Sequence, residues 1–216
     1  MKISKPDLTG ISNLIFDFGG VLIDIDYEDV RKAFQAIGLK DVRAFYQHEN
    51  HSKLVEDFEQ GFISPDRFRD SIISDINKDI SHSSFDSAWN AIIKHVPSMR
   101  VKLLQNLNKH YNLYLLSNTN IIHYNKYVKE FKQEHGIDLR SLFRKSYFSH
   151  EVKLRKPNPE IFEYVIEDAG LEKSHTLFID DSEENVEASR HVGIPAFYKP
   201  QKEELVDFFN DRENNE

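Results

Sequence analysis

The stretch LIFDFGGVL, residues 14–22, decides the fold of this chain. It opens with three apolar residues at 14–16, and Asp17 and a Gly-Gly pair at 19–20 follow them. A short apolar run that stops at such residues is typical of a buried strand. A carboxylate buried at the tip of a strand costs free energy unless a cation or a hydrogen-bond donor meets it. The stretch therefore predicts a buried strand that presents Asp17 to a ligand.

Three further short runs end at polar residues in the same way. They are LYLL at 113–116 before Ser117-Asn118, SYF at 146–148 before Ser149, and LFI at 177–179 before Asp180-Asp181. Apolar spacings of 3 and 4 residues between the runs predict helices near residues 98–107, 161–169 and 182–192. Ser98 is expected to cap the first of these helices. Strands that alternate with helices predict an α/β fold, a doubly wound parallel (Rossmann-like) sheet covered by helices.

Residues 27–97 are patterned differently. Five helix-like patterns follow one another there without a convincing strand, and the pair Ser64-Pro65 is typical of a helix start. The region lies between the first and second predicted strands, which favours an inserted all-helical lid. The predicted domains are a Rossmann-like catalytic core of residues 1–26 and 97–216 and a helical cap of residues 27–96.

The composition is that of a soluble globular protein and excludes several function classes. The 216 residues fit one large domain or one domain with a smaller insert. The chain has no cysteine, which excludes disulfide scaffolds, thiolate zinc sites and cysteine nucleophiles. Its net charge of -8 argues against a nucleic-acid or membrane-surface partner, and no apolar run is long enough for a transmembrane helix. The opening residues lack the apolar core of a secretory signal, so a cytoplasmic location is expected.

Carboxylates are predicted to gather at one edge of the sheet. In open parallel sheets, ligands bind beyond the carboxyl ends of the strands, near the point where the strand order reverses. Asp17 and the pair Asp180-Asp181 follow two different strands. Together with an exposed backbone carbonyl, they make a hard oxygen site suited to Mg²⁺.

Groups that bind anions are expected at the same edge. Ser117, Asn118 and Thr119 can offer a hydroxyl and backbone donors to an anion at the start of the next helix, and Lys156 adds positive charge. A phosphoryl group in transfer carries negative charge on its oxygens. A carboxylate nucleophile, a magnesium ion, a hydroxyl and a lysine therefore suit phosphoryl transfer.

Four motifs of the chain resemble those of the haloacid dehalogenase superfamily of phosphohydrolases. They appear in order as LIFDFGGVL, LLSNTN, LRKPNPEIF and LFIDDSEENV, and the helical insert resembles the cap of one large subclass. The glycine at position 19 also resembles a bacterial subgroup that includes sugar-1-phosphate phosphatases. The resemblance implies Mg²⁺-dependent hydrolysis of a small phosphorylated metabolite, with a sugar phosphate as one candidate.

The resemblance also implies a role for each motif residue. Asp17 would be the nucleophile and form an aspartyl-phosphate. Ser117 and Asn118 would bind the phosphoryl oxygens. Lys156 would steady the nucleophile and the transferring phosphate, and Asp180 would orient that lysine.

The implied metal ligands are the Asp17 carboxylate, the backbone carbonyl of Gly19 and the Asp181 carboxylate. Phosphatases of the family usually carry a second aspartate, the acid and base, at the position that Gly19 holds here. A positioned acid or base contributes about 10²- to 10⁴-fold to the rate. Its absence leaves three alternatives: another group takes the role of the aspartate, the leaving group needs little protonation, or turnover is slow. Asp24 and Asp26 are close enough in sequence to supply a carboxyl.

Two other functions stay open at this point. A metal-free 2-haloacid dehalogenase uses the same aspartate, and Gly19 permits it, although Asp180-Asp181 looks like the metal-binding form of the fourth motif. A non-catalytic relative that binds a phosphorylated metabolite is the second alternative. The substrate's identity and the oligomeric state are not determined by the sequence.

Several residues also have ordinary structural explanations. Asp17 fits a turn, Ser117-Asn118 fits a helix cap, and Asp180-Asp181 fits the N-terminal end of a helix. Lys153 and Arg155, which lie near the motif lysine, are expected at the solvated surface. Relatives often have glycine at position 153. His48 and His51 do not have the spacing of a zincin metal site and are expected to be cap or surface residues. Trp89 and the phenylalanines are expected in the core.

Overall fold

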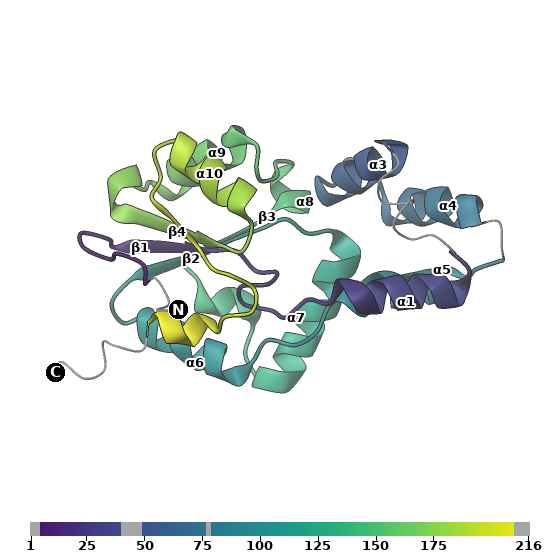
Figure 1. Ribbon diagram of the computed structural model, residues 1–216, viewed down its shortest axis with the longest axis horizontal. Coiled ribbons are helices and arrows are strands. Elements are labelled where there is room, and N and C mark those ends of the chain that lie inside the picture. The colour runs from purple at the N-terminus through teal and green to yellow at the C-terminus, as the bar shows by residue number, and fades with distance from the viewer. Residues whose placement is uncertain (1–4, 40–48, 77–78, 210–216) are drawn as a thin grey trace.

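The computed structural model describes residues 5–39, 49–76 and 79–209 (Figure 1). Five parallel strands form one sheet in the order β3-β2-β1-β4-β5. They are β1 (Asn13–Phe16), β2 (Asn112–Ser117), β3 (Lys145–Phe148), β4 (Thr176–Asp180) and β5 (Ala196–Tyr198). The strand order reverses at β1, which lies between β2 and β4. The predicted doubly wound parallel sheet is therefore confirmed.

The edge strand β5 was not predicted from the sequence. It has only three residues, all of them half-buried. Its residues Ala, Phe and Tyr are apolar, but prolines at positions 195 and 200 flank them, and proline is typical of turns and loops. The backbone N–H of Lys199, just after β5, donates to the Asp180 carbonyl at 2.9 Å and carries the pairing to the strand tips.

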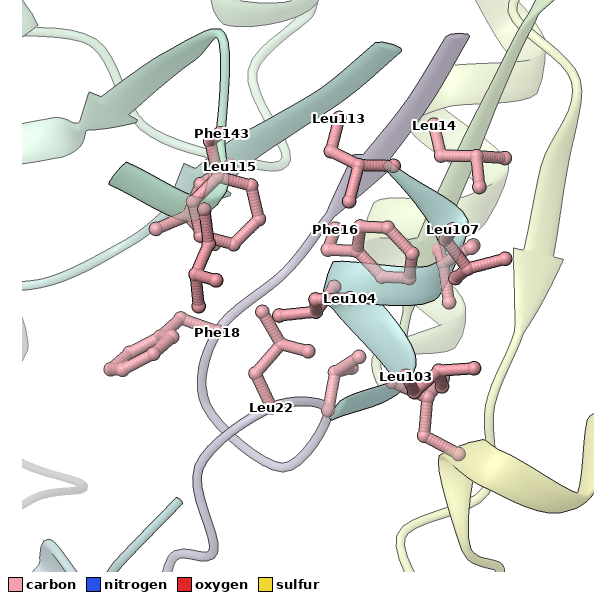
Figure 2. Packing of buried hydrophobic residues seen from close by; sticks show 14 of the residues in the cluster. Leu14, Phe16, Phe18, Leu22, Leu103, Leu104, Leu107, Leu113, Leu115 and Phe143 are labelled. Atoms are coloured by element: carbon pink, nitrogen blue, oxygen red, sulfur yellow. The ribbon is translucent and has the colours of Figure 1, made fainter. Parts of the chain in front are cut away.

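Helices cover both faces of the sheet (Figure 1). One face packs against α6 (Ser98–Leu107), α7 (Ile121–His135), η2 (Leu139–Leu142) and η4 (Leu205–Phe208). The other face packs against α8 (Ser149–Val152), α9 (Pro159–Ala169) and α10 (Glu183–His191), and η3 (Lys173–His175) leads into β4. Side chains alternate along a strand, so Leu14 and Phe16 of β1 join the first cluster and Ile15 joins the second. Figure 2 shows Leu104 and Leu107 of α6 close to Phe16.

The predicted helices occur, but one predicted cap is wrong. α10 is capped by Ser182, whose hydroxyl accepts the Asn185 N–H, and the chain turns at Gly193 with φ 85°. α6 instead begins at Ser98 itself, and Pro97 holds the cap position without a side-chain hydrogen bond. Proline fixes its own φ in a range that suits entry into a helix, but it has no side-chain acceptor, so the first turn of α6 has no side-chain cap.

The region after β1 is helical, as predicted. It contains α1 (Tyr27–Ile37), α3 (Glu49–Glu59), α4 (Pro65–Ile76), α5 (His82–Trp89) and η1 (Asn90–Ile92). These helices share a hydrophobic cluster in which Phe34, Phe58, Phe68, Phe85 and Trp89 contact one another, and the Phe58 and Phe68 rings stack 4.1 Å apart. The prediction of these aromatic residues as core is confirmed. Figure 1 shows α3 and α4 at one end of the molecule, away from the sheet.

Two connections join these helices to the sheet, and they lie side by side. Asp24 N–H donates to His95 O at 3.2 Å, and Lys94 N–H donates back to Asp24 O at 3.0 Å. Asp26 N–H donates to Ile92 O at 2.9 Å. The chain therefore leaves and re-enters the α/β core at one place. Within the described ranges, no helix is both long and apolar enough to cross a membrane.

Candidate active site

The candidate site lies at the carboxyl ends of β1, β2 and β4, where the strand order reverses. Phe16 of β1 is in register with Leu115 of β2 and Ile179 of β4, so the strands end close together. Asp17 extends β1 by one further bond, because its N–H donates to the Ile179 carbonyl at 2.8 Å. Parallel pairing thus brings residues that are far apart in sequence to one edge, as the sequence predicts.

Lys156 is at the centre of this site. Its Nζ donates to Asp17 Oδ1 at 2.5 Å, to Asp180 Oδ2 at 2.7 Å and to the Leu116 carbonyl at 3.0 Å. An ammonium group has three N–H donors, so all of them are used. Burial alone would lower the pKa of Lys156, but the two carboxylates outweigh it and raise that pKa. The lysine is therefore a fixed, buried positive charge.

Asp180 is fully engaged within the protein. It is completely buried, and its oxygens accept from Lys156, from Ser182 N–H at 2.8 Å and from Asn185 Nδ2 at 3.1 Å. Its carboxylate thus has little capacity left for a metal ion. This geometry fits the role predicted for Asp180, which is to orient the lysine.

Asp17 and Asp181 are better placed to hold a cation. Carboxylate oxygens of Asp17, Asp180 and Asp181 lie within 4.8 Å of one another. Burial raises the pKa of Asp17 to about 7, despite the neighbouring Lys156, and burial also raises the pKa of Asp181. Both ionised carboxylates are thus short of compensating charge. Their hard oxygens fit Mg²⁺, and Gly19, whose carbonyl is the third ligand expected from the sequence, lines the same cavity.

Gly20 allows the backbone to approach Asp181. Its φ is +74°, and a Cβ there would lie 2.2 Å from Asp181 Oδ2. The Gly20 carbonyl accepts from Lys199 Nζ at 2.8 Å, and Gln201 Nε2 donates to Asp181 Oδ2 at 2.5 Å. Lys199 is completely buried. No spacing signal pointed to Lys199 or Gln201, because both follow the short strand β5.

We expect Gly20→Ala to weaken the metal site. The new methyl group would displace the Asp181 carboxylate, so the Mg²⁺ concentration for half-maximal activity should rise about 10- to 100-fold. Titration of activity with Mg²⁺ measures this shift. Gly136→Ala is the matched control, because Gly136 has φ +72° but nothing within 4 Å of its Cβ position. Equal Mg²⁺ requirements in the two variants would contradict the interpretation.

Asn118 has a different contact from the one its motif suggests. Its side-chain Nδ2 donates to the Lys156 carbonyl at 2.8 Å, and its Oδ1 accepts the Lys156 N–H at 2.9 Å. The carboxamide therefore fixes the loop that carries Lys156, and the backbone N–H is the group that Asn118 can offer to an anion. Ser117 is buried and lines the cavity. Asn120, rather than either of these residues, caps α7 by accepting the His123 N–H.

The suggestion that Asp24 or Asp26 supplies the missing acid is not supported. Asp24 Oδ1 accepts from Arg100 Nη1 at 2.8 Å, and the buried guanidinium of Arg100 also binds Glu204. Asp26 caps α1 by accepting the N–H groups of its first turn. Neither carboxylate is among the residues that line the cavity. Both are used to hold the chain in place as it leaves the core.

Lys153 is exposed, as expected, whereas Arg155 is partly buried and the expectation that it is a solvated surface residue is wrong. Arg155 Nη2 donates to Glu59 Oε2 at 3.1 Å. Lys153 Nζ donates to the Gly61 carbonyl and lies over the Phe62 ring. Lys153 adopts φ 65°, in the left-handed region where glycine is more common. Both side chains join the catalytic-loop segment to the end of α3, a contact that local spacing does not predict.

The site opens into a cavity of about 750 Å³ between the sheet and the helical region. Asp17, Ser117, Asn118, Lys156 and Asp181 line it on the side of the sheet. The opposite side comes from the helices after β1 and from η1: it includes Tyr27, Val30, Arg31, Val55, Glu59, Trp89 and Ile92. The volume suits a small metabolite.

Among the residues that the structure describes, one histidine lines the cavity, and its contacts are structural. His123 Nε2 lies 3.0 Å from the Trp89 carbonyl, and its Nδ1 lies 3.1 Å from Asn120 Nδ2. Burial lowers the pKa of His123 to about 4, so the ring is neutral at pH 7. His48 lies outside the described residues, as does the side chain of His51, so the roles predicted for these two stay predictions.

Comparison with known proteins adds independent findings. Residues 11–193 match the family described as haloacid dehalogenase-like hydrolase. A D-ribitol-5-phosphate phosphatase of Bacteroides thetaiotaomicron is 32% identical over 188 residues, which cover 87% of this chain and 91% of that protein. A phosphorylated carbohydrates phosphatase of Thermotoga maritima is 24% identical over 86% of this chain and 83% of that protein. The chain also matches a crystal structure of a HAD family enzyme from Bacteroides thetaiotaomicron in complex with magnesium and inorganic phosphate. The TM-score is 0.86 and the sequence identity is 37%, and the match covers 92% of this chain and 99% of that chain.

Proposed function

Because this chain belongs to the haloacid dehalogenase-like hydrolase family, we propose that it is a Mg²⁺-dependent phosphatase that acts on a small phosphorylated sugar or sugar alcohol. One observation carries the proposal: the Lys156 ammonium lies between Asp17 and Asp180, with Asp181 alongside, at the base of a cavity. The phosphatases that resemble the chain act on D-ribitol 5-phosphate and on phosphorylated carbohydrates, which supports this substrate class.

Asp17 is the proposed nucleophile. A carboxylate oxygen of Asp17 would attack the phosphorus atom, the P–O bond to the sugar oxygen would break as that oxygen takes a proton from water, and an aspartyl-phosphate would form. Attack of water on that phosphorus would then release inorganic phosphate and restore the carboxylate. The Lys156 ammonium, 2.5 Å from Asp17 Oδ1, holds the nucleophile in place. In its charged form, it favours the negative charge that accumulates on the phosphoryl oxygens.

The remaining roles follow from position. Ser117 Oγ and the backbone N–H of Asn118 would donate hydrogen bonds to the phosphoryl oxygens at the end of β2. Asp17, Asp181 and the Gly19 carbonyl would hold Mg²⁺. When bound, Mg²⁺ neutralises charge on the phosphoryl oxygens and on the carboxylates. We also propose that residues 27–96 are a cap, because their helices form the wall of the cavity opposite the sheet.

The dehalogenase alternative is not favoured. Three carboxylates gather at the site, and two relatives that match over more than four-fifths of both proteins are phosphatases. A related HAD family enzyme was crystallised with magnesium and inorganic phosphate.

A cytoplasmic location stays a prediction.

Phosphate release by the purified protein tests the proposal. We expect release from sugar and sugar alcohol phosphates with Mg²⁺ and a fall of about 100-fold or more after EDTA, because several kcal/mol of charge stabilisation are lost. Restoration of the rate by added Mg²⁺ is the control for EDTA itself. Release that is equally fast in EDTA would contradict the proposal, as would halide release from 2-haloacids in EDTA.

A further inference from the structure

Two charged side chains from different parts of the chain meet on the cavity wall. Arg155 precedes the catalytic lysine on the core side, and Glu59 is the last residue of α3. Arg155 Nη2 donates to Glu59 Oε2 at 3.1 Å, and both residues line the cavity that contains Asp17. This pair therefore lies on the wall of the space that holds the part of a substrate beyond its phosphate.

The hydrogen-bonding capacity of the pair is not used up. Arg155 Nε is buried, and among the residues that the structure describes it has no hydrogen-bond partner. The described hydrogen bond to Glu59 uses Oε2 alone. Burial raises the pKa of Glu59 despite the contact with Arg155, so the ionised carboxylate is short of donors. A donor and an acceptor thus await partners at one place.

The surrounding wall makes this place distinctive. Most of the other side chains that the helical region contributes to the cavity are apolar: they include Val30, Val55, Trp89, Ile92 and Ile93. A hydroxyl group against that wall would lose its water partners without replacement. A hydroxyl group at the Arg155–Glu59 pair would replace its hydrogen bonds to water with charge-assisted hydrogen bonds, which are stronger than those between neutral groups.

We infer that Arg155 and Glu59 bind hydroxyl groups of the substrate and thereby select polyhydroxylated phosphate monoesters. The Arg155 guanidinium donates to one hydroxyl oxygen, and the Glu59 carboxylate accepts a hydroxyl proton from the same carbon chain. The inference rests on the proposed phosphatase function and assigns its specificity to two named residues. One of the two residues lies on the α/β core and the other on α3, so these two segments have to be in contact when substrate binds.

Paired substrates of equal chain length test the inference. D-ribitol 5-phosphate and pentyl phosphate have the same number of carbons and the same phosphate, and they differ in hydroxyl groups. We expect Glu59→Gln to lower the ratio of kcat/KM for ribitol phosphate over pentyl phosphate about 10-fold, since a charge-assisted hydrogen bond to a carboxylate becomes a neutral one to an amide. Arg155→Lys, which keeps the charge but loses the Nε–H, should lower the same ratio.

Glu56→Gln is the matched control. Glu56 lies on the same helix, 3.5 Å from Arg155 Nη1, but it is not among the residues lining the cavity. The ratio should stay at the wild-type value in this variant. A fall as large as that of Glu59→Gln would overturn the inference, because the effect would then come from the contact between segments. Melting temperatures of all variants separate recognition from loss of folding.

Other outcomes are also decisive. An unchanged ratio in Glu59→Gln and Arg155→Lys would overturn the inference. The inference would also be overturned if Glu59→Gln lowered kcat/KM equally for ribitol phosphate and pentyl phosphate but not for p-nitrophenyl phosphate. Glu59 would then be a proton donor to poor leaving groups. Wild-type inactivity on all three compounds with Mg²⁺ would overturn the phosphatase proposal itself, which is a distinguishable result.

Discussion

Asp17→Asn is expected to lower kcat by about 10⁴-fold or more on every phosphate monoester that the wild type hydrolyses. The amide nitrogen and oxygen of asparagine are far weaker nucleophiles than a carboxylate, so the aspartyl-phosphate does not form. Lys156 keeps its contact with Asp180 at 2.7 Å in the variant, so the surrounding geometry should persist. Single-turnover and steady-state phosphate release with Mg²⁺ measure the loss.

The same substitution should not lower stability. The pKa of Asp17 is raised by burial from 3.8 to about 7, so its ionisation destabilises the folded state increasingly as pH rises through that interval. At pH 8 without Mg²⁺, the neutral carboxamide of the Asp17→Asn variant avoids this cost, and the free energy of unfolding should increase by up to a few kcal/mol. Urea unfolding of both proteins in EDTA at pH 8 gives the comparison. At pH 4 the difference should nearly vanish.

Asp24→Asn is the control for this experiment. Asp24 pairs with Arg100 outside the cavity, so the variant should retain activity while losing some stability. The nucleophile assignment would be contradicted by an active Asp17→Asn protein. An inactive Asp24→Asn protein that remains folded would instead revive Asp24 as a catalytic acid.

Lys156→Met is expected to have the second-largest effect. The substitution leaves the buried carboxylates of Asp17 and Asp180 close together without their shared positive charge. Loss of one partner from a buried ion pair costs about 3 to 5 kcal/mol of stability. Loss of a fixed positive charge beside the reacting phosphoryl group lowers kcat by about 10³-fold. Urea unfolding and phosphate release measure the two effects separately.

A second substitution separates folding from chemistry. Adding Asp180→Asn to Lys156→Met removes one of the uncompensated charges, so part of the stability should return while kcat stays low. Lys153→Met, three positions away on the same segment, should lose far less activity, because Lys153 contacts Gly61 rather than Asp17. Recovery of full activity in the double variant would show that the lysine is needed only for folding.

The sequence by itself determined the α/β architecture and the location of the site. Short apolar runs that end at Asp17, Ser117 and Asp180 predict buried parallel strands, and the carboxyl ends of parallel strands meet at one edge. Local patterns suffice for this because burial and strand geometry constrain each run separately. Strand β5 was missed because prolines at positions 195 and 200 flank its three apolar residues and are typical of turns and loops.

Only the tertiary structure decided which side chains became partners. The Asp24–Arg100 pair, the Asn118 contacts with Lys156, and the Arg155–Glu59 pair each join segments that are distant in the chain. Such contacts depend on the relative placement of packed elements, which residue spacing along the chain does not encode. The gathering of carboxylates at the strand tips was therefore predictable from sequence, whereas the contact between Arg155 and Glu59, which we propose to recognise the substrate, depends on the packing of α3 beside the segment that carries Lys156.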